Sequence, residues 1–213
     1  MDGHELAHIV AAVLLMFVVA GVTFAIIGDA FGLVQVFVFS VIVIGVPIVV
    51  KKTIAYALDA DVKHEIWGVY HFGFKPKEHF RKERPFGVIV PLVFSFLGVL
   101  IRFPLMVMTF LTYETTALKY RAAKRHGFYS YTEMTDWHNG LIGAFGVVSL
   151  WLIAMLGYLA GWEFLMKMAS YYAFWNMVPV SKLDGTQIFF GNRILWVVLA
   201  VISLLFVFYA VMI

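Results

Sequence analysis

Two short patterns in the sequence carry side chains that could bind a metal ion, and the first lies at the N-terminus. His4-Glu5-Leu6-Ala7-His8 has the form H-E-x-x-H. Histidines four residues apart share one face of a helix and can hold zinc, while the glutamate can activate a zinc-bound water. This spacing predicts a zinc site with His4 and His8 as ligands and Glu5 as general base.

The second pattern, N-x-x-P-x-x-x-x-D-G, runs from Asn176 through Pro179 to Asp184 and Gly185. Asn and Pro can interrupt a membrane helix and open a polar pocket, which a carboxylate can enter as a metal ligand, and Gly permits a tight turn. Asp184 is therefore a candidate metal ligand, and the other three residues are expected to shape its pocket. The alternative is a simple helix end, in which Asp184 and Gly185 form a surface turn.

The N-terminal pattern also has an explanation without a metal. Asp2 can cap the first helix while Glu5, three residues later, completes a capping box. His4 and His8 would then be interfacial residues in the first turns of that helix. The sequence leaves both interpretations open.

The elements that must position these residues are membrane helices. Of the 213 residues, 62% are hydrophobic and 14% are charged, and the mean hydropathy is +0.90. A soluble domain has about 45–50% apolar and about 25% charged residues. We therefore expect an integral protein of the cell membrane, with the lipid bilayer as its solvent and partner. Its basic residues are not concentrated on one soluble face, which argues against nucleic-acid binding.

Five apolar stretches have about the 20 residues needed to span a bilayer. The predicted fold is an all-α integral membrane protein forming a single polytopic domain over residues 1–213, with spans at residues 9–27, 31–50, 139–161, 163–181 and 194–213. The basic segments 51–85 and 112–138 are expected on the cytoplasmic side. This places the N-terminus in the cytoplasm and the C-terminus outside, and puts His64 in a solvated or headgroup-facing loop.

The apolar run over residues 86–111 lies between these two basic segments and cannot be a simple span. A single crossing would put its ends on opposite sides of the membrane. The run also contains Pro91, Gly98, Arg102 and Pro104, and an arginine at mid-membrane is costly. We expect a broken or re-entrant hairpin shielded by neighbouring helices.

The C-terminal pattern is the one with which site-2 proteases supply their third zinc ligand, and the chain resembles this family of intramembrane zinc metalloproteases. Residues 139–213 follow the family's closing layout of a span, a helix carrying the aspartate motif and a final helix. Residues 52–55 and 60–67 look like the stretch after the zinc-binding helix in small archaeal-type members. The resemblance implies a zinc metalloendopeptidase that cleaves transmembrane helices of substrate proteins.

The chain departs from the family pattern in two places. The resemblance over residues 52–67 places the family's H-E-x-x-H on residues 47–51, which read Pro-Ile-Val-Val-Lys and contain neither a metal ligand nor a general base. The family's G-P-x-x-N element corresponds to residues 146–150, which keep the glycine and lose the proline and asparagine. The histidine motif is therefore either displaced to the N-terminus or lost.

Two functions follow from these patterns. In the first, zinc is held by His4, His8 and Asp184, with Glu5 as base, and the chain is an active intramembrane protease. In the second, the chain is a non-catalytic pseudoprotease or scaffold that binds membrane helices of partner proteins. The residues alone do not decide between them.

Overall fold

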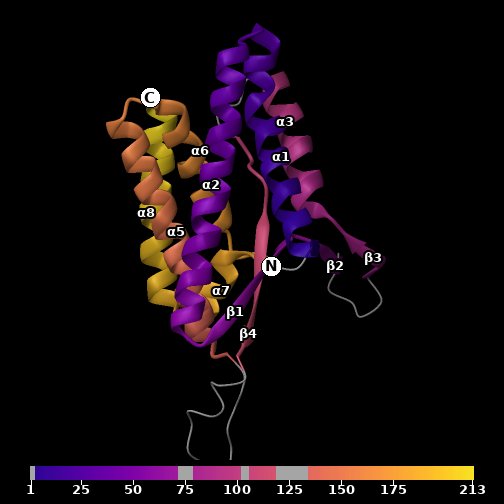
Figure 1. Cartoon of the computed structure of the whole chain (residues 1–213), viewed down its shortest axis with the longest axis vertical. Helices are drawn as coiled ribbons and strands as arrows, with labels where there is room; N and C mark the ends of the chain where they lie inside the picture. Colours follow the sequence, from indigo (N-terminus) through magenta and orange to yellow (C-terminus); the bar gives the residue numbers. More distant parts are fainter. Residues whose placement is uncertain (1–2, 72–78, 102–105, 119–133) are drawn as a thin grey trace, which may run out of the picture.

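The chain folds as a helical membrane protein (Figure 1). The computed structural model describes residues 3–71, 79–101, 106–118 and 134–213. Its helices are α1 (Gly3–Ile27), α2 (Ala30–Ala57), α3 (Phe86–Ile101), α5 (Asp136–Leu159), α6 (Glu163–Asn176), α7 (Asp184–Gly191) and α8 (Arg193–Met212). Among the described helices, α1, α2, α5 and α8 are long and apolar enough to cross a membrane.

Helices α1 and α2 form an antiparallel pair joined by a very short connection. Gly28 has φ 79°, a backbone conformation that glycine adopts without strain. Asp29 caps α2, because its Oδ1 accepts a hydrogen bond of 3.0 Å from Gly32 N. Helix α2 continues to Ala57, well past the predicted boundary at residue 50. Lys51 and Lys52 therefore belong to this helix and not to a loop.

Helices α5, α6 and α8 pack together with the short α7 as a second group of helices. The predicted fourth span, residues 163–181, is wrong in extent, because α6 ends at Asn176. Proline at 179 has no N–H to donate and disfavours helical backbone before it. At 1.5 Å per residue, the 14 residues of α6 cover about 21 Å, less than the roughly 30 Å of a bilayer's apolar core.

The apolar run 86–111 returns to the end of the molecule from which it starts, as the re-entrant prediction requires. Gly87 N donates to Trp67 O at 2.8 Å, and Trp67 N donates to Phe110 O at 3.0 Å. Both ends of the run are thus bonded to the same residue. The predicted positions of Arg102 and Pro104 in this run lie outside the described residues.

Two small sheets occupy segments that the sequence predicts to be polar loops. Strand β1 (Ala60–Ile66) pairs antiparallel with β4 (Leu111–Ala117), and β2 (Val69–His71) pairs with β3 (His79–Arg84). Side chains along β1 alternate between buried and exposed. This alternation turns His64 inward, so the expectation of a solvated His64 is wrong. The β1–β4 sheet lies at the lower end of the bundle (Figure 1).

The outer faces of the long helices are apolar and exposed, as lipid contact requires. In an apolar 18-residue stretch of each helix, only 22% of α8 is buried inside the protein, whereas 61% of α5 is buried. Helix α5 is therefore the central helix. The C-terminus lies near the upper end of the bundle, and the N-terminus lies lower, where α1 begins (Figure 1). The placement of the termini on opposite sides of the membrane, with the N-terminus in the cytoplasm, stays a prediction.

The pairing of β1 with β4 can be tested with two introduced cysteines, because the chain has none of its own. Asp61 and Thr116 are exposed and lie opposite each other in the sheet. Paired residues lie within the Cα separation that a disulfide bridges. We expect the Asp61→Cys/Thr116→Cys variant to form an intramolecular disulfide on mild oxidation, detected as a gel shift that reductant reverses.

The matched control is Asp61→Cys/Thr115→Cys, in which the second cysteine points to the other face of the strand. It should cross-link far less. Single cysteines at 61 and 116 should also react with a membrane-impermeant maleimide from the same side of a sealed vesicle. Labelling from opposite sides would mean that residues 86–111 cross the membrane and are not re-entrant.

Candidate functional site

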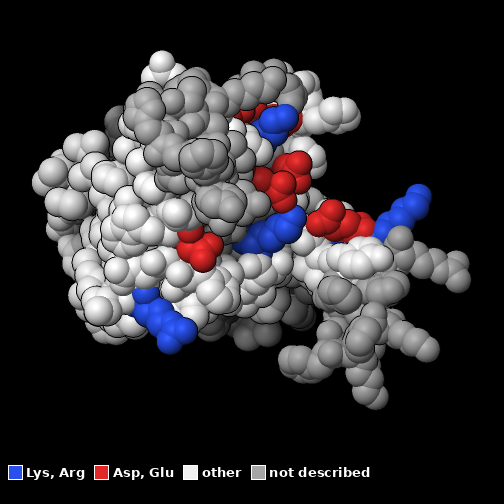
Figure 2. Space-filling model, turned by 90° about the horizontal axis from the view of Figure 1, so that it is seen from below, with Lys and Arg blue, Asp and Glu red and all other residues white. Residues whose placement is uncertain are grey.

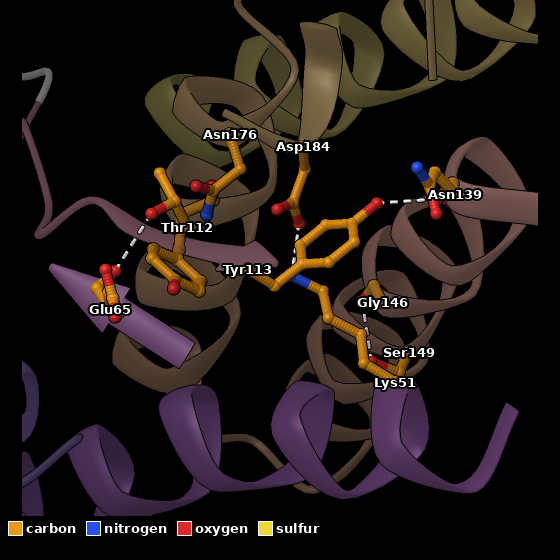
Figure 3. Close-up of polar contacts among 10 residues, drawn as sticks. Lys51, Glu65, Thr112, Tyr113, Asn139, Gly146, Ser149, Asn176 and Asp184 are labelled. Carbon is orange, nitrogen blue, oxygen red and sulfur yellow. Dashed lines mark hydrogen bonds and ion pairs between the residues drawn. The ribbon is translucent and has the colours of Figure 1, made fainter. Parts of the chain in front are cut away.

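A buried ion pair joins the lower end of α2 to the start of α7. Lys51 Nζ lies 2.5 Å from Asp184 Oδ2, and their side chains are only 6% and 4% exposed. Figure 3 shows the Lys51 side chain reaching from α2 past α5 to the carboxylate. The surface-turn alternative for Asp184 is therefore wrong, since this carboxylate is inside the protein.

Two neighbours make the path of Lys51 possible. A Cβ added at Gly146 of α5 would lie 2.4 Å from Lys51 Cε, so a larger residue there would force this side chain out of its present path. On the other side, the ring centroid of Tyr113 from β4 lies 4.7 Å from Lys51 Nζ, within the range of a cation–π contact. The Tyr113 hydroxyl donates to Asn139 O at 2.6 Å, which fixes the ring against α5.

The residues of the C-terminal pattern surround the carboxylate. Asn176 is the last residue of α6, and Asp184 is the first of α7. Gly185 lies so close to the preceding loop that an added Cβ would be 2.2 Å from Met177 O. The glycine therefore lets α7 begin directly against the end of α6, which brings Asp184 beside Asn176 (Figure 3).

The pocket contains acceptor atoms that the ion pair does not use. Asp184 Oδ1 and Asn176 Oδ1 are buried and have no hydrogen-bond partner among the described residues. Burial raises the pKa of Asp184, while the charge and hydrogen bond of Lys51 oppose that rise. The Lys51 ammonium is thus the group that stabilises this carboxylate in its ionised form.

A second charged cluster lies at the start of α1. Glu5 is 5% exposed, and its Oε1 lies 2.7 Å from Lys52 Nζ and 3.3 Å from both Nδ1 and the backbone N of His64. These contacts join α1 to α2 and β1, so they differ from the capping-box contact predicted for Glu5. Asp2, its predicted partner, lies outside the described residues.

His64 is the buried histidine of this cluster. Burial and the nearby charge of Lys51 lower its pKa to about 3, although Glu5 acts in the opposite direction. A neutral imidazole has one N–H, and the position of Glu5 assigns it to Nδ1. Nε2 is buried without a hydrogen-bond partner among the described residues.

The histidines predicted as zinc ligands are placed differently. His4 is exposed, and His8 Nδ1 accepts a long hydrogen bond of 3.4 Å from Ile66 N. No group of three or more His, Asp or Glu side chains that could hold a metal ion occurs in the described part of the chain. The Lys51 ammonium would also repel a cation at Asp184. These residues do not fit the predicted zinc site of His4, His8 and Asp184.

The basic partners in both clusters were missed by sequence reasoning. Lys51 and Lys52 read as the start of a cytoplasmic loop, and His64 as part of that loop. The signal that could have found Lys51 is its place in the family resemblance, at the last of residues 47–51, where the resemblance expects H-E-x-x-H. Figure 2, which views the molecule from below, shows basic and acidic side chains lying side by side on this face.

Removing either partner of the Lys51–Asp184 pair should destabilise the protein strongly. A buried charge left without its partner costs about 3–5 kcal/mol, whereas replacing both partners by apolar residues is often close to neutral. We expect Lys51→Met and Asp184→Leu each to lower the melting temperature in detergent by more than the double variant does. The Lys182–Glu114 pair, about half exposed, is the control, because breaking it should have little effect. Additive losses in the double variant would contradict a paired role.

The depressed pKa of His64 predicts a specific pH dependence of stability. The ordinary pKa of histidine is 6.5, and that of His64 is about 3, so between these values the unfolded chain binds a proton that the folded chain excludes. The free energy of unfolding should therefore fall as the pH is lowered below about 6.5, and be fully restored above it. His64→Gln should lose this dependence. Melting temperatures of both proteins, measured from about pH 7.5 to pH 4.5, check this; a constant difference between them would contradict it.

Comparisons with known proteins add no family to this geometry. No family model, no curated protein and no solved structure matches the chain. The functional argument therefore rests on the buried pair and its surroundings.

Proposed function

We propose that this chain is a non-catalytic relative of the site-2 proteases, a pseudoprotease that binds membrane helices without cutting them. The observation that carries the proposal is the buried Lys51–Asp184 ion pair, with Nζ and Oδ2 2.5 Å apart. In the resemblance, Lys51 stands at the last histidine of H-E-x-x-H and Asp184 at the third zinc ligand. The two positions expected to share a metal thus share an ion pair.

The chemistry of the pair supports a site without hydrolytic power. A zinc ion in such a site lowers the pKa of a bound water and so supplies a hydroxide nucleophile. An ammonium on a carboxylate satisfies the same negative charge but has no open coordination position. Glu5, the predicted base, is itself held by Lys52 and His64. Glu5 is thus engaged with these two partners and not with Asp184.

The re-entrant run adds support for a helix-binding role. Leu183, next to Asp184, is packed in one buried cluster with Trp67 and Phe110. Trp67 is the residue to which both ends of the run are hydrogen-bonded. Helix α3 of this run lies against α1 (Figure 1) and carries exposed large side chains on one face, including Phe94 and Leu97. A short helix with an exposed apolar face beside the pocket can pack against a membrane helix of a partner.

Rebuilding the histidine motif tests the proposal most directly. Pro47→His/Ile48→Glu/Lys51→His restores H-E-x-x-H where the resemblance places it. We expect the wild-type chain to hold no stoichiometric zinc and the triple variant to hold about one zinc per chain, with Asp184 as third ligand. Elemental analysis of purified protein measures this. Asp184→Ala added to the triple variant should abolish binding.

Lys51→His alone is the second variant, for the case that the triple variant does not fold. It leaves the rest of α2 unchanged. It should gain weak, Asp184-dependent zinc affinity. One zinc per wild-type chain, lost in Asp184→Ala, would overturn the proposal. So would a folded triple variant together with a folded Lys51→His that bind no zinc.

The helix-binding half of the proposal has its own readout. A photo-crosslinking residue at Phe94 of α3 should capture a transmembrane peptide in proteoliposomes, and the matched residue at Leu205, exposed on α8, should not. Capture should persist with chelator and in Glu5→Gln, with the peptide intact. Equal capture at both positions would refute a specific site, and chelator-sensitive cleavage of the peptide would refute the non-catalytic assignment.

A further inference from the structure

A cavity separate from the buried ion pair opens between the β2–β3 hairpin, the start of α3 and the loop that follows α6. Its volume is about 740 Å³, within the range of about 300–1,000 Å³ that is usual for small-ligand sites. The residues that matter for its chemistry are Trp67, Tyr70, Glu83, Phe86, Ser181 and Lys182. They combine aromatic rings with one acidic and one basic group.

The acidic side of the cavity is suited to an organic cation. Glu83 lies directly against the backbone of Gly68, where an added Cβ would be 2.4 Å from Glu83 Oε1. The absence of a side chain at Gly68 thus leaves room for this carboxylate at the cavity wall. The rings of Tyr70 and Phe86 line the same cavity. A carboxylate beside aromatic faces is a favourable environment for an alkylammonium group.

The basic side is suited to a phosphate. Ser181 and Lys182 line the cavity. Lys182 Nζ lies 2.6 Å from Glu114 Oε1, but both side chains are more than half exposed, so this pair is easily exchanged for another anion. A phosphodiester can accept hydrogen bonds from the Lys182 ammonium and the Ser181 hydroxyl.

An apolar strip leads away from the cavity along α3. Phe86, at the cavity, is the first residue of that helix. Ile89, Val93, Phe96 and Leu100 follow at spacings of three and four residues, and all four are exposed. They therefore form one face of the helix, on which hydrocarbon chains can lie.

We infer that the cavity binds the headgroup of a zwitterionic phospholipid, whose acyl chains lie along α3. The ammonium meets Glu83 and the rings of Tyr70 and Phe86, and the phosphodiester meets Lys182 and Ser181. Phosphatidylethanolamine and phosphatidylcholine both carry these two charges. The site does not depend on the proposed function, because its headgroup contacts lie outside the Lys51–Asp184 pair and the strip on α3 is a different face from the one that carries Phe94.

Native mass spectrometry of the full chain in detergent, with defined lipids added, tests this inference. We expect phosphatidylethanolamine or phosphatidylcholine to bind more tightly than phosphatidylglycerol, which has no cation for Glu83. Glu83→Gln should weaken binding of the preferred lipid by roughly tenfold. Glu163→Gln is the matched control, since Glu163 is an exposed acid in the first turn of α6 and does not line the cavity; it should leave binding unchanged.

A soluble headgroup, glycerophosphocholine, separates the contribution of the strip on α3 from that of the cavity. The intact lipid should bind at least about tenfold more tightly, because its chains bury apolar surface. Equal affinity for the soluble headgroup, tighter binding of phosphatidylglycerol, or a Glu83→Gln variant with the same melting temperature and unchanged lipid binding would each overturn the inference. So would displacement of the lipid by a basic peptide at equal concentration, which would assign the cavity to a polypeptide.

Discussion

Two neighbouring lysines at the C-terminal end of α2 set the constraint on which this end of the molecule depends. An ammonium group cannot remain unpaired in a medium of low dielectric. Successive residues of a helix point in directions about 100° apart, so Lys51 and Lys52 reach different elements. Lys51 pairs with Asp184 of α7, and Lys52 pairs with Glu5 of α1. One helix end thereby ties the N-terminal helix pair to the C-terminal helices.

The β1–β4 sheet contributes a side chain to each of the two charged clusters, and it anchors the re-entrant run. His64 of β1 contacts Glu5, and Tyr113 of β4 covers the Lys51 ammonium. Because β4 directly follows the re-entrant run, its pairing with β1 fixes where that run returns. Polar contacts therefore hold a segment whose own sequence is almost wholly apolar. Lipid contact alone would not specify the position of such a short helix.

Structural features that depend on the local sequence are predicted correctly, whereas features that depend on residues distant in the sequence are not. Apolar length alone identifies α1, α2, α5 and α8, and the charges flanking residues 86–111 predict their return. The sequence predicts that this span ends at residue 50, because Lys51 is the first charged residue after the apolar run. Asp184, the residue that makes a buried lysine tolerable there, is 133 positions away, so the local sequence does not indicate the pairing. The alternation of β1 was likewise hidden, since its inward positions include a histidine.

Under the proposed function, the departures from the family pattern become one connected change. If the metal-binding histidines are lost while Asp184 stays buried, its carboxylate has no counter-charge, and that cost would destabilise the fold. A lysine at position 51 restores the charge, but its side chain needs space beside α5. The structure supplies that space at Gly146, the one residue of the G-P-x-x-N element that is kept, where a Cβ would meet Lys51 Cε at 2.4 Å. Under this proposal Gly146, Asp184 and Lys51 depend on each other physically, because the glycine gives the lysine its space and the lysine supplies the counter-charge of the aspartate.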